Sequence, residues 1–291
     1  MTIRPMRFAA ILCTPGSVGD LISQARSAAD SGCDVVLLPD HLSWAAPLPS
    51  LVAVAAAVPS MRVGSCVLNT AFYQPALLAR DLAAVDSAIG GRLEIGLGAG
   101  YSADEFTTAG LRFPTPAERV QVLGEHVRQI RAAFADPNYS PTPTQQAPPI
   151  MIGGSGDKVL ALAARNADIV SIYSLGSETE LAQRVSHIKH EAGDRVDDIE
   201  LSFSFAQISL DDRSDHQILE RLAPNASDSK VQAMATLLNR SIEDAAERIV
   251  RLHQQLGISY FTFTITGSRG VTWRTLGKLM DRAKELQTRT S

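Results

Sequence analysis

The chain has 291 residues, of which 45% are hydrophobic and 20% charged, the composition of a globular protein with a large core. Its 27 basic and 31 acidic side chains leave a net charge of −4, and no basic cluster is dense enough for a nucleic-acid footprint. No uncharged apolar run approaches the roughly 18 residues that a membrane helix needs, and the N-terminus lacks a signal peptide's cleavage site. We therefore expect a protein that binds neither nucleic acid nor membrane.

The cysteines Cys13, Cys33 and Cys66 are odd in number and scattered, and their spacing matches no metal-binding motif. This argues against both a disulfide framework and a zinc site, and it fits a reducing compartment. We expect a cytoplasmic protein that holds no metal.

Eight short apolar runs alternate with longer amphipathic segments along the chain. Most of these runs are continuously apolar, as in parallel strands that are covered on both faces. The predicted strands are Phe8–Cys13, Asp34–Leu38, Arg62–Leu68, Arg92–Leu97, Ile150–Ile152, Ile169–Ile172, Ile199–Ile208 and Ile258–Ile265.

The segments between the strands carry helix signals. Apolar residues recur at helical spacing over Val18–Ala29 and again over Leu78–Ile89. A capping box with proline at the first helical position, Thr115–Glu118, begins a long helix. Ser241 begins a later helix, and Gly257 ends it.

Eight strand–helix units without an internal repeat or a domain-sized linker favour one (β/α)8 TIM barrel over residues 1–291. An open doubly wound sheet is the alternative. Two connections exceed ordinary loop length and follow the C-terminal ends of predicted strands, where barrel active sites lie. These are Gly98–Pro114 after the fourth strand and Ser209–Arg240 after the seventh, in which Ser214–Leu222 and Ser229–Leu238 look helical. They are either lids and substrate-selecting walls or tolerated surface insertions.

A glycine-rich turn follows the fifth predicted strand at Gly153, Gly154, Ser155 and Gly156. Glycine permits positive φ and a close approach to a ligand, and the amides at the following helix N-terminus attract an anion. Three glycines in four residues favour a phosphate cradle over a plain tight turn. The segment has neither the Rossmann fingerprint nor the Walker A ending.

Asp40 and His41 follow the second predicted strand, at the rim where a barrel places its catalytic groups. A histidine there can donate to a ring carbonyl or carry a proton near neutral pH. A local Asp–His hydrogen bond explains the pair equally well. Trp44 can form a flat wall for a ring, or it can pack as an ordinary aromatic residue.

Small residues mark the third and fourth strands. They leave room for something flat against the backbone, or they simply fit a narrow barrel layer; they are Gly64, Ser65, Cys66, Gly96, Gly98 and Gly100. Asn69, at the end of the third strand, can bond a hydroxyl or a phosphate.

Taken together, these segments resemble the luciferase-like monooxygenase superfamily, and within it the branch that uses the deazaflavin coenzyme F420. The matching segments occur in family order and cover nearly the whole chain. They are Leu38–His41, Arg62–Asn69, Pro75–Arg80, Gly91–Gly100, Ile152–Gly154 and Glu243–Leu252.

The resemblance implies a (β/α)8 barrel with the deazaflavin in its C-terminal mouth. Cys66–Val67 would occupy the site of a non-prolyl cis peptide that bulges against the central ring. The implied cofactor-binding residues are Asp40, His41, Cys66, Val67, Asn69, Gly153, Gly154, Ser155 and Gly156.

The chain departs from the glucose-6-phosphate dehydrogenases of this branch. In those enzymes a glutamate follows the third glycine of the fourth strand, whereas Tyr101 stands here and the next acids are Asp104 and Glu105. Their tryptophan also lies one residue further from the histidine than Trp44 does from His41. These differences argue against a sugar-phosphate oxidase.

The resemblance implies an F420-dependent oxidoreductase that transfers a hydride to an activated C=C or C=N bond of a small molecule, or the reverse oxidation of an alcohol. The implied catalytic residues are His41, Tyr101 and Trp44, with His41 or Tyr101 supplying or orienting the proton. A monooxygenase that uses FMN and a separate flavin reductase is the first alternative, because FMN has the same tricyclic ring, ribityl chain and phosphate. A non-catalytic cofactor-binding protein is the second. Family analogy implies a homodimer.

Overall fold

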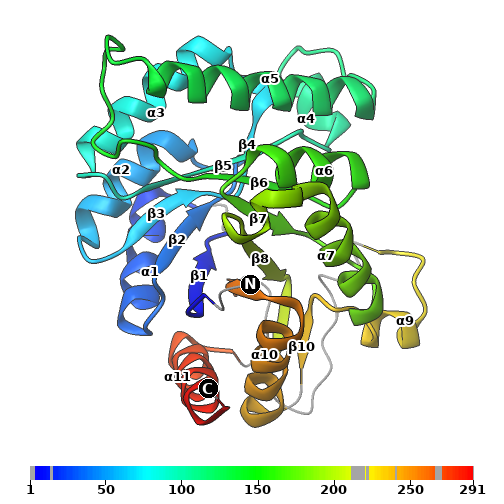
Figure 1. Cartoon of the computed structure of the whole chain (residues 1–291). Helices are drawn as coiled ribbons and strands as arrows, with labels where there is room; N and C mark the ends of the chain where they lie inside the picture. Colours follow the sequence, from blue (N-terminus) through cyan, green and yellow to red (C-terminus); the bar gives the residue numbers. More distant parts are fainter. Residues whose placement is uncertain are drawn as a thin grey trace.

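The computed structural model describes residues 4–13, 16–210, 220, 223–239, 241–265 and 271–290, and Figure 1 shows how their elements are arranged. The strands form a parallel barrel, in which β11 lies between β1 and β8 and the order continues through β7 and β6 to β5. Its strands are β1 (Arg7–Ile11), β2 (Val35–Leu38), β3 (Arg62–Ser65), β4 (Leu68–Asn69), β5 (Leu93–Gly98), β6 (Ile150–Gly154), β7 (Ile169–Ile172), β8 (Glu200–Phe205) and β11 (Ile258–Thr264).

The pairing of β3 with β5 closes the barrel, with Val63 opposite Leu93 and Gly64 opposite Glu94. Since β3 and β4 together make one strand position, the barrel has the eight positions of a (β/α)8 fold. The barrel prediction is therefore confirmed. The open-sheet alternative is wrong, because an open sheet would leave β3 and β5 unpaired.

Helices surround the barrel in Figure 1. The α-helices are α1 (Val18–Asp30), α2 (Pro47–Ala57), α3 (Pro75–Ala88), α4 (Ala103–Thr108), α5 (Pro116–Ala135), α6 (Asp157–Asn166), α7 (Glu178–Ala192), α9 (Asp228–Gln232), α10 (Ile242–Leu256) and α11 (Trp273–Thr290). The 3-10 turns are η1 (Thr70–Phe72) and η2 (Gly193–Asp197). Within the described ranges, none of these helices is both long and apolar enough to cross a membrane.

The predicted helix ends are those of the structure. The Thr115 hydroxyl accepts from the Glu118 amide, and the Glu118 carboxylate accepts from the Thr115 amide, which completes the capping box of α5. Ser241 begins α10 with the same reciprocal pattern, and Gly257 ends that helix with φ +79°. These contacts satisfy amides that would otherwise lack partners in the first turn.

Two strands that were predicted as continuous are broken. The third predicted strand is divided into β3 and β4 at Cys66 and Val67. The seventh is divided at Ala206, after which β9 (Gln207–Ser209) leaves the barrel and pairs in parallel with β10 (Leu237–Asn239). The hydrophobic pattern of a sequence indicates only which residues are buried. Because the residues on both sides of each break are buried, the pattern could not reveal the breaks.

The two long connections follow β5 and β8, as predicted. The first carries α4. In the second, the helix predicted over Ser229–Leu238 is wrong beyond Gln232, because α9 ends there and β10 follows. The helix predicted over Ser214–Leu222 lies, except for residue 220, outside the described residues. Val231 and Met234 of this connection pack in one apolar cluster with Tyr173, which follows β7.

A charged network fills the barrel interior at its N-terminal end. Glu94 of β5 bridges Arg7 Nη1 at 2.6 Å and Arg62 Nε at 2.9 Å, and it accepts from the Tyr260 hydroxyl at 3.2 Å. Arg7 also contacts Glu200 at 2.6 Å, and its guanidinium lies 3.6 Å from the Tyr260 ring centroid. The network closes the floor of the barrel, so a ligand must enter from the opposite end.

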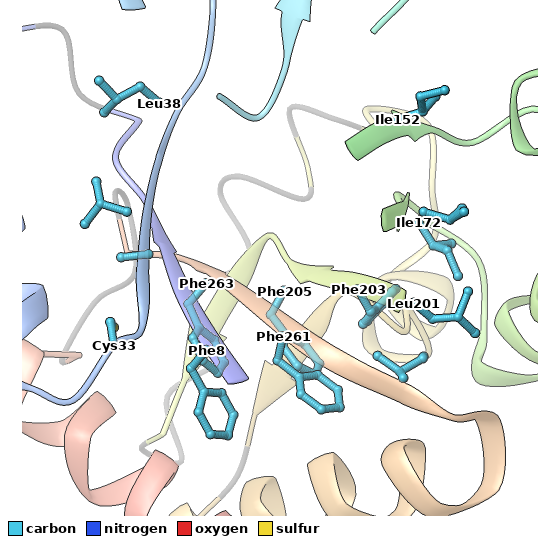
Figure 2. Close-up of a cluster of buried hydrophobic side chains, with 14 of the residues drawn as sticks. Phe8, Cys33, Leu38, Ile152, Ile172, Leu201, Phe203, Phe205, Phe261 and Phe263 are labelled. Atoms are coloured by element: carbon cyan, nitrogen blue, oxygen red, sulfur yellow. The ribbon is translucent and has the colours of Figure 1, made fainter. Parts of the chain in front are cut away.

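Outside the barrel, a layer of phenylalanines joins β1, β8 and β11. Figure 2 shows Phe8, Phe205, Phe261 and Phe263 side by side on these neighbouring strands. The ring centroids of Phe8 and Phe263 are 5.9 Å apart, and those of Phe205 and Phe263 are 5.8 Å apart. Lys284 of α11 lies over the Phe8 ring. The layer thus seats the C-terminal helix on the first strand.

Candidate active site

Asp40 anchors the rim of the barrel where β2 ends. Its side chain is buried, and its Oδ2 accepts from the Asn69 amide at 3.1 Å and from the Tyr73 hydroxyl at 3.0 Å. Burial raises the pKa of the Asp40 carboxyl, while these two hydrogen bonds act in the opposite direction. Asp40 therefore ties the end of β2 to the end of β4 and to the turn that follows it.

His41 lies beside Asp40 and belongs to a second group of side chains. Its Nδ1 is 2.9 Å from Glu105 Oε1, an oxygen that also accepts from the Leu42 amide at 3.2 Å. The Trp44 ring meets the His41 ring edge-on at 4.6 Å between centroids, and the Tyr101 ring does so at 6.1 Å. The structure thus brings together the three predicted catalytic residues and adds a carboxylate.

The connection after β5 carries Tyr101 and Glu105, which both lie beside His41. Gly100, with φ +72°, turns the chain at the end of the strand, and Tyr101 follows with 75% of its surface exposed. Phe106 is buried and contacts Phe72 and Phe113, which fixes α4 to the barrel. Glu105, the neighbour of this anchor, is held over His41.

Glu105 and Tyr73 are candidate site residues that the sequence did not reveal. The sequence marks Glu105 only as an acidic residue in the connection after the fourth predicted strand. Nothing in that pattern indicates that its side chain meets the end of β2, which only the fold shows.

The Val67 side chain fills the space beside two glycines. The peptide bond between Cys66 and Val67 is cis, as the family resemblance implied. A Cβ on Gly98 would lie 2.3 Å from Val67 Cγ2, and one on Gly153 would lie 3.0 Å from Val67 Cγ1. Because both positions are glycine, the Val67 side chain fits between them. Val67 thereby packs the third strand position against the fourth and the fifth.

Other glycines bring the backbones of β3 and β5 close together. A Cβ on Gly96 would lie 1.8 Å from the Ser65 carbonyl oxygen, and one on Gly64 would lie 2.4 Å from the Glu94 carbonyl oxygen. The Ser65 hydroxyl donates to the Gly96 carbonyl and accepts from its amide. The expectation that Gly64 and Gly96 leave room for a flat ligand is wrong, because neighbouring backbone atoms occupy that space.

Substituting Gly98 by alanine should lower the free energy of unfolding by about 1–3 kcal/mol, the usual cost of overpacking a close contact. The added methyl would overlap the Val67 side chain. Urea unfolding followed by circular dichroism measures the change. The double variant Gly98→Ala/Val67→Ala should recover part of the loss, whereas Gly19→Ala, whose Cβ meets only ordinary contact distances, should be neutral. A single variant as stable as the wild type would contradict the steric explanation.

The segment Gly153–Gly156 differs from the predicted turn. Gly153 and Gly154 belong to β6, and neither they nor Gly156 has a positive φ. Positive φ was therefore the wrong reason for these glycines. A Cβ on Gly154 would lie 2.3 Å from Val159 Cγ1, so this glycine allows α6 to pack closely on its strand.

Gly156 is the N-cap of α6 and has nothing within 4 Å of an added Cβ. No side chain caps this helix, and the Val159 amide bonds back to the Gly156 carbonyl. In the part of the chain that the structure describes, this leaves the amides of Asp157 and Lys158 without a hydrogen-bond partner in the first turn. Ser155 and Gly156 are exposed. Within the described chain, no hydrogen bond joins them to the group around His41.

Tyr173 connects the two ends of the site. Its amide donates to the Gly154 carbonyl at 3.1 Å, and it directly follows β7. Burial, together with the nearby Tyr101, raises the pKa of Tyr173 to about 12. Tyr173 therefore ties the end of β7 to the end of β6 at this rim.

Two cysteines lie on the same rim and stay protonated. Burial raises the pKa of both Cys13 and Cys66 to about 12. Cys13 follows β1, and Cys66 begins the break between β3 and β4. Over the described ranges, histidine, cysteine and acidic side chains form no cluster that would hold a metal ion.

A closed parallel barrel whose polar and aromatic side chains gather at the strands' C-terminal ends defines a (β/α)8 protein with its site in the usual place. The sequence model of the luciferase-like monooxygenase family matches residues 2–257, and the chain belongs to that family.

Individual relatives are more distant. The chain is 32% identical over 200 residues to an F420-dependent glucose-6-phosphate dehydrogenase of Nakamurella multipartita, covering 58% of this chain and 56% of that protein. It is 29% identical over 156 residues to a 5,10-methylenetetrahydromethanopterin reductase of Archaeoglobus fulgidus, covering 50% and 47%. These matches thus span about half the length of either relative. A structure of an F420-dependent secondary alcohol dehydrogenase in complex with an F420–acetone adduct superimposes with a TM-score of 0.79 at 17% identity, over 96% of this chain and 99% of that one.

Proposed function

We propose that this protein is a coenzyme F420-dependent oxidoreductase that binds the deazaflavin at the C-terminal mouth of its barrel. The observation that carries the proposal is the His41–Glu105 pair, 2.9 Å apart and flanked by the rings of Trp44 and Tyr101. It supplies a proton-exchanging group at the mouth of a barrel whose named relatives use F420. Hydride chemistry on a small molecule needs such a group.

The residues at the mouth fit a ligand with a phosphate and a hydroxylated chain. The uncapped N-terminus of α6, with open space at Gly156, would receive the phosphate. Gly153, Gly154 and Ser155 would line the approach to it. Asn69 uses its Oδ1 to accept from Ala71, and its Nδ2 has no hydrogen-bond partner in the described structure, so it would donate to a hydroxyl.

The ring end of the site would be formed by Asp40, His41, Cys66 and Val67. Bound F420 supplies a two-electron hydride carrier that reacts poorly with oxygen. His41 then exchanges the proton with the substrate, and Trp44 and Tyr101 hold the substrate beside it and exclude water. We propose an activated C=C or C=N bond as the reducible group, and the same geometry serves the reverse oxidation of an alcohol.

Fluorescence titration of the purified protein tests the cofactor assignment. F420 should quench the emission of Trp44 with a saturable isotherm and bind more tightly than FMN. The chain has two tryptophans, so the Trp273→Phe variant leaves Trp44 as the sole reporter. Tight binding of FMN together with oxygen-dependent turnover would instead establish the monooxygenase alternative.

A substrate panel with reduced F420 tests the reaction. Cyclohexenone represents an activated C=C bond, methylpyrroline a C=N bond, and acetone a ketone. Oxidation of F420 by either of the first two supports the proposed reduction. F420 binding with no turnover of any of the three would favour the non-catalytic alternative.

The expected homodimer and cytoplasmic location stay predictions. Size-exclusion chromatography with light scattering of the full chain tests the first, and cell fractionation tests the second.

A further inference from the structure

Glu105 is the acid that meets His41, and it reaches His41 from a different part of the barrel. It lies in the first turn of α4, after β5, whereas His41 follows β2. One oxygen, Oε1, is 2.9 Å from His41 Nδ1 and accepts from the Leu42 amide at 3.2 Å. The histidine ring and its own backbone segment are thus both tied to one carboxylate.

A carboxylate at this distance determines which ring nitrogen carries the proton. An ionised carboxylate only accepts hydrogen bonds, so Nδ1 must be the donor. In the neutral ring, Nε2 is then the acceptor, free to exchange a proton with a substrate. The edge-on rings of Trp44 and Tyr101 restrict rotation that would exchange the two nitrogens.

Other charged groups near His41 have separate partners. Asp40 is adjacent in the chain, but its Oδ2 is engaged by the Asn69 amide and the Tyr73 hydroxyl. Burial raises the pKa of the Asp40 carboxyl, and the nearby Glu105 charge adds to that shift. Burial keeps the Cys13 thiol protonated, so it carries no charge beside this group.

We propose that Glu105 is a positioning residue that holds the His41 proton on Nδ1 and stabilises the imidazolium during proton transfer at Nε2. The proposal rests on the proposed function. In the reduction, the substrate carbon gains a hydride from reduced F420, which is oxidised by two electrons. The other atom of the double bond gains the proton of Nε2–H, whose bond breaks. His41 returns to the neutral form with its remaining proton on Nδ1, and solvent reprotonates Nε2.

The first test needs neither cofactor nor substrate. In the ¹⁵N-histidine spectrum of the full chain at alkaline pH, the His41 signals, identified by their loss in His41→Ala, should show protonated Nδ1 and unprotonated Nε2. In Glu105→Ala this preference should be lost, because the acceptor is gone. Asp104→Asn, which removes the neighbouring exposed charge, should leave the wild-type pattern. A wild-type spectrum with the proton on Nε2 would overturn the proposal.

The second test uses F420 oxidation with whichever panel substrate turns over. Glu105→Gln keeps an acceptor but removes the charge, so kcat should fall about 10–100-fold, the size of effect seen for carboxylates that orient metal-bound histidines, with KM and F420 affinity unchanged. Asp104→Asn should match the wild type. Equal kcat in Glu105→Gln and wild type would contradict the role in stabilising the imidazolium.

The two tests also separate this proposal from the proposed function. A wild-type protein that shows the Nδ1-protonated ring but neither binds F420 nor reduces any panel substrate would overturn the proposed function, and the mechanistic role of Glu105 with it. The positioning of the ring by Glu105 would then still be established by the spectrum.

Discussion

Alanine in place of His41 is expected to lower kcat by about 10²–10⁴-fold, the usual contribution of a positioned acid–base group. F420 affinity should fall far less than kcat, because His41 is one of several groups proposed to hold the cofactor, and Asp40, Asn69 and the entry to α6 are untouched. The reason is that, in the proposed mechanism, His41 exchanges the proton with the substrate while the Glu105 carboxylate accepts from its Nδ1. Single-turnover oxidation of reduced F420 and the fluorescence titration measure the two quantities separately.

Tyr101→Phe is the matched comparison, because Tyr101 is the other candidate proton donor. The substitution keeps the ring that flanks His41 and removes only the hydroxyl. The surrounding protein and the Glu105 charge raise the pKa of the Tyr101 hydroxyl, so the hydroxyl stays neutral although most of the side chain is exposed. We expect this variant to retain most of its kcat. If Tyr101→Phe lost as much kcat as His41→Ala, Tyr101 would be identified as the proton donor. If His41→Ala turned over like the wild type, His41 would have no role in proton transfer.

The largest effect on stability is expected at the barrel floor. Glu94→Ala should lower the free energy of unfolding by about 3–5 kcal/mol, the cost of removing one partner from a buried ion pair. The change leaves Arg62 without its carboxylate and the Tyr260 hydroxyl without its acceptor, while Arg7 keeps only Glu200. Urea unfolding of the wild type and the variant measures the difference.

An exposed ion pair provides the control for the Glu94→Ala variant. Arg80 and Asp81 form a contact of similar length, 2.8 Å, but both side chains are about half exposed. Asp81→Ala should therefore change the free energy of unfolding by no more than about 1 kcal/mol. If Glu94→Ala proved as mild as Asp81→Ala, the floor network would not stabilise the barrel in the way proposed.

Much of the fold can be predicted from local patterns in the sequence. Phe8, Val36 and Met151 lie in short continuously apolar runs, and each run forms a buried strand of the barrel. Thr115 and Ser241 begin helices through hydrogen bonds to residues three positions away. Such contacts depend on neighbours in sequence, so a single chain reveals them. The candidate site residues Asp40, His41 and Asn69 could be predicted for the same reason, because each closely follows a strand that the local pattern indicates.

The remaining features depend on contacts between distant segments. Glu105 meets His41 across 64 residues, and the Gly98 backbone faces the Val67 side chain. β9 leaves the barrel and pairs with β10, which lies 28 residues or more further along the chain. Periodicity and capping carry no signal for any of these contacts.

The sequence by itself determined the eight-unit barrel, the rim that carries Asp40, His41 and Asn69, and the resemblance to the family. These follow from burial periodicity and from short motifs, which are properties of neighbouring residues. Only the tertiary structure decided that Glu105 meets His41 and that Gly98 and Gly153 make room for Val67. The reason is that closing the barrel sets the distances between strand ends, and those distances decide which side chains act together.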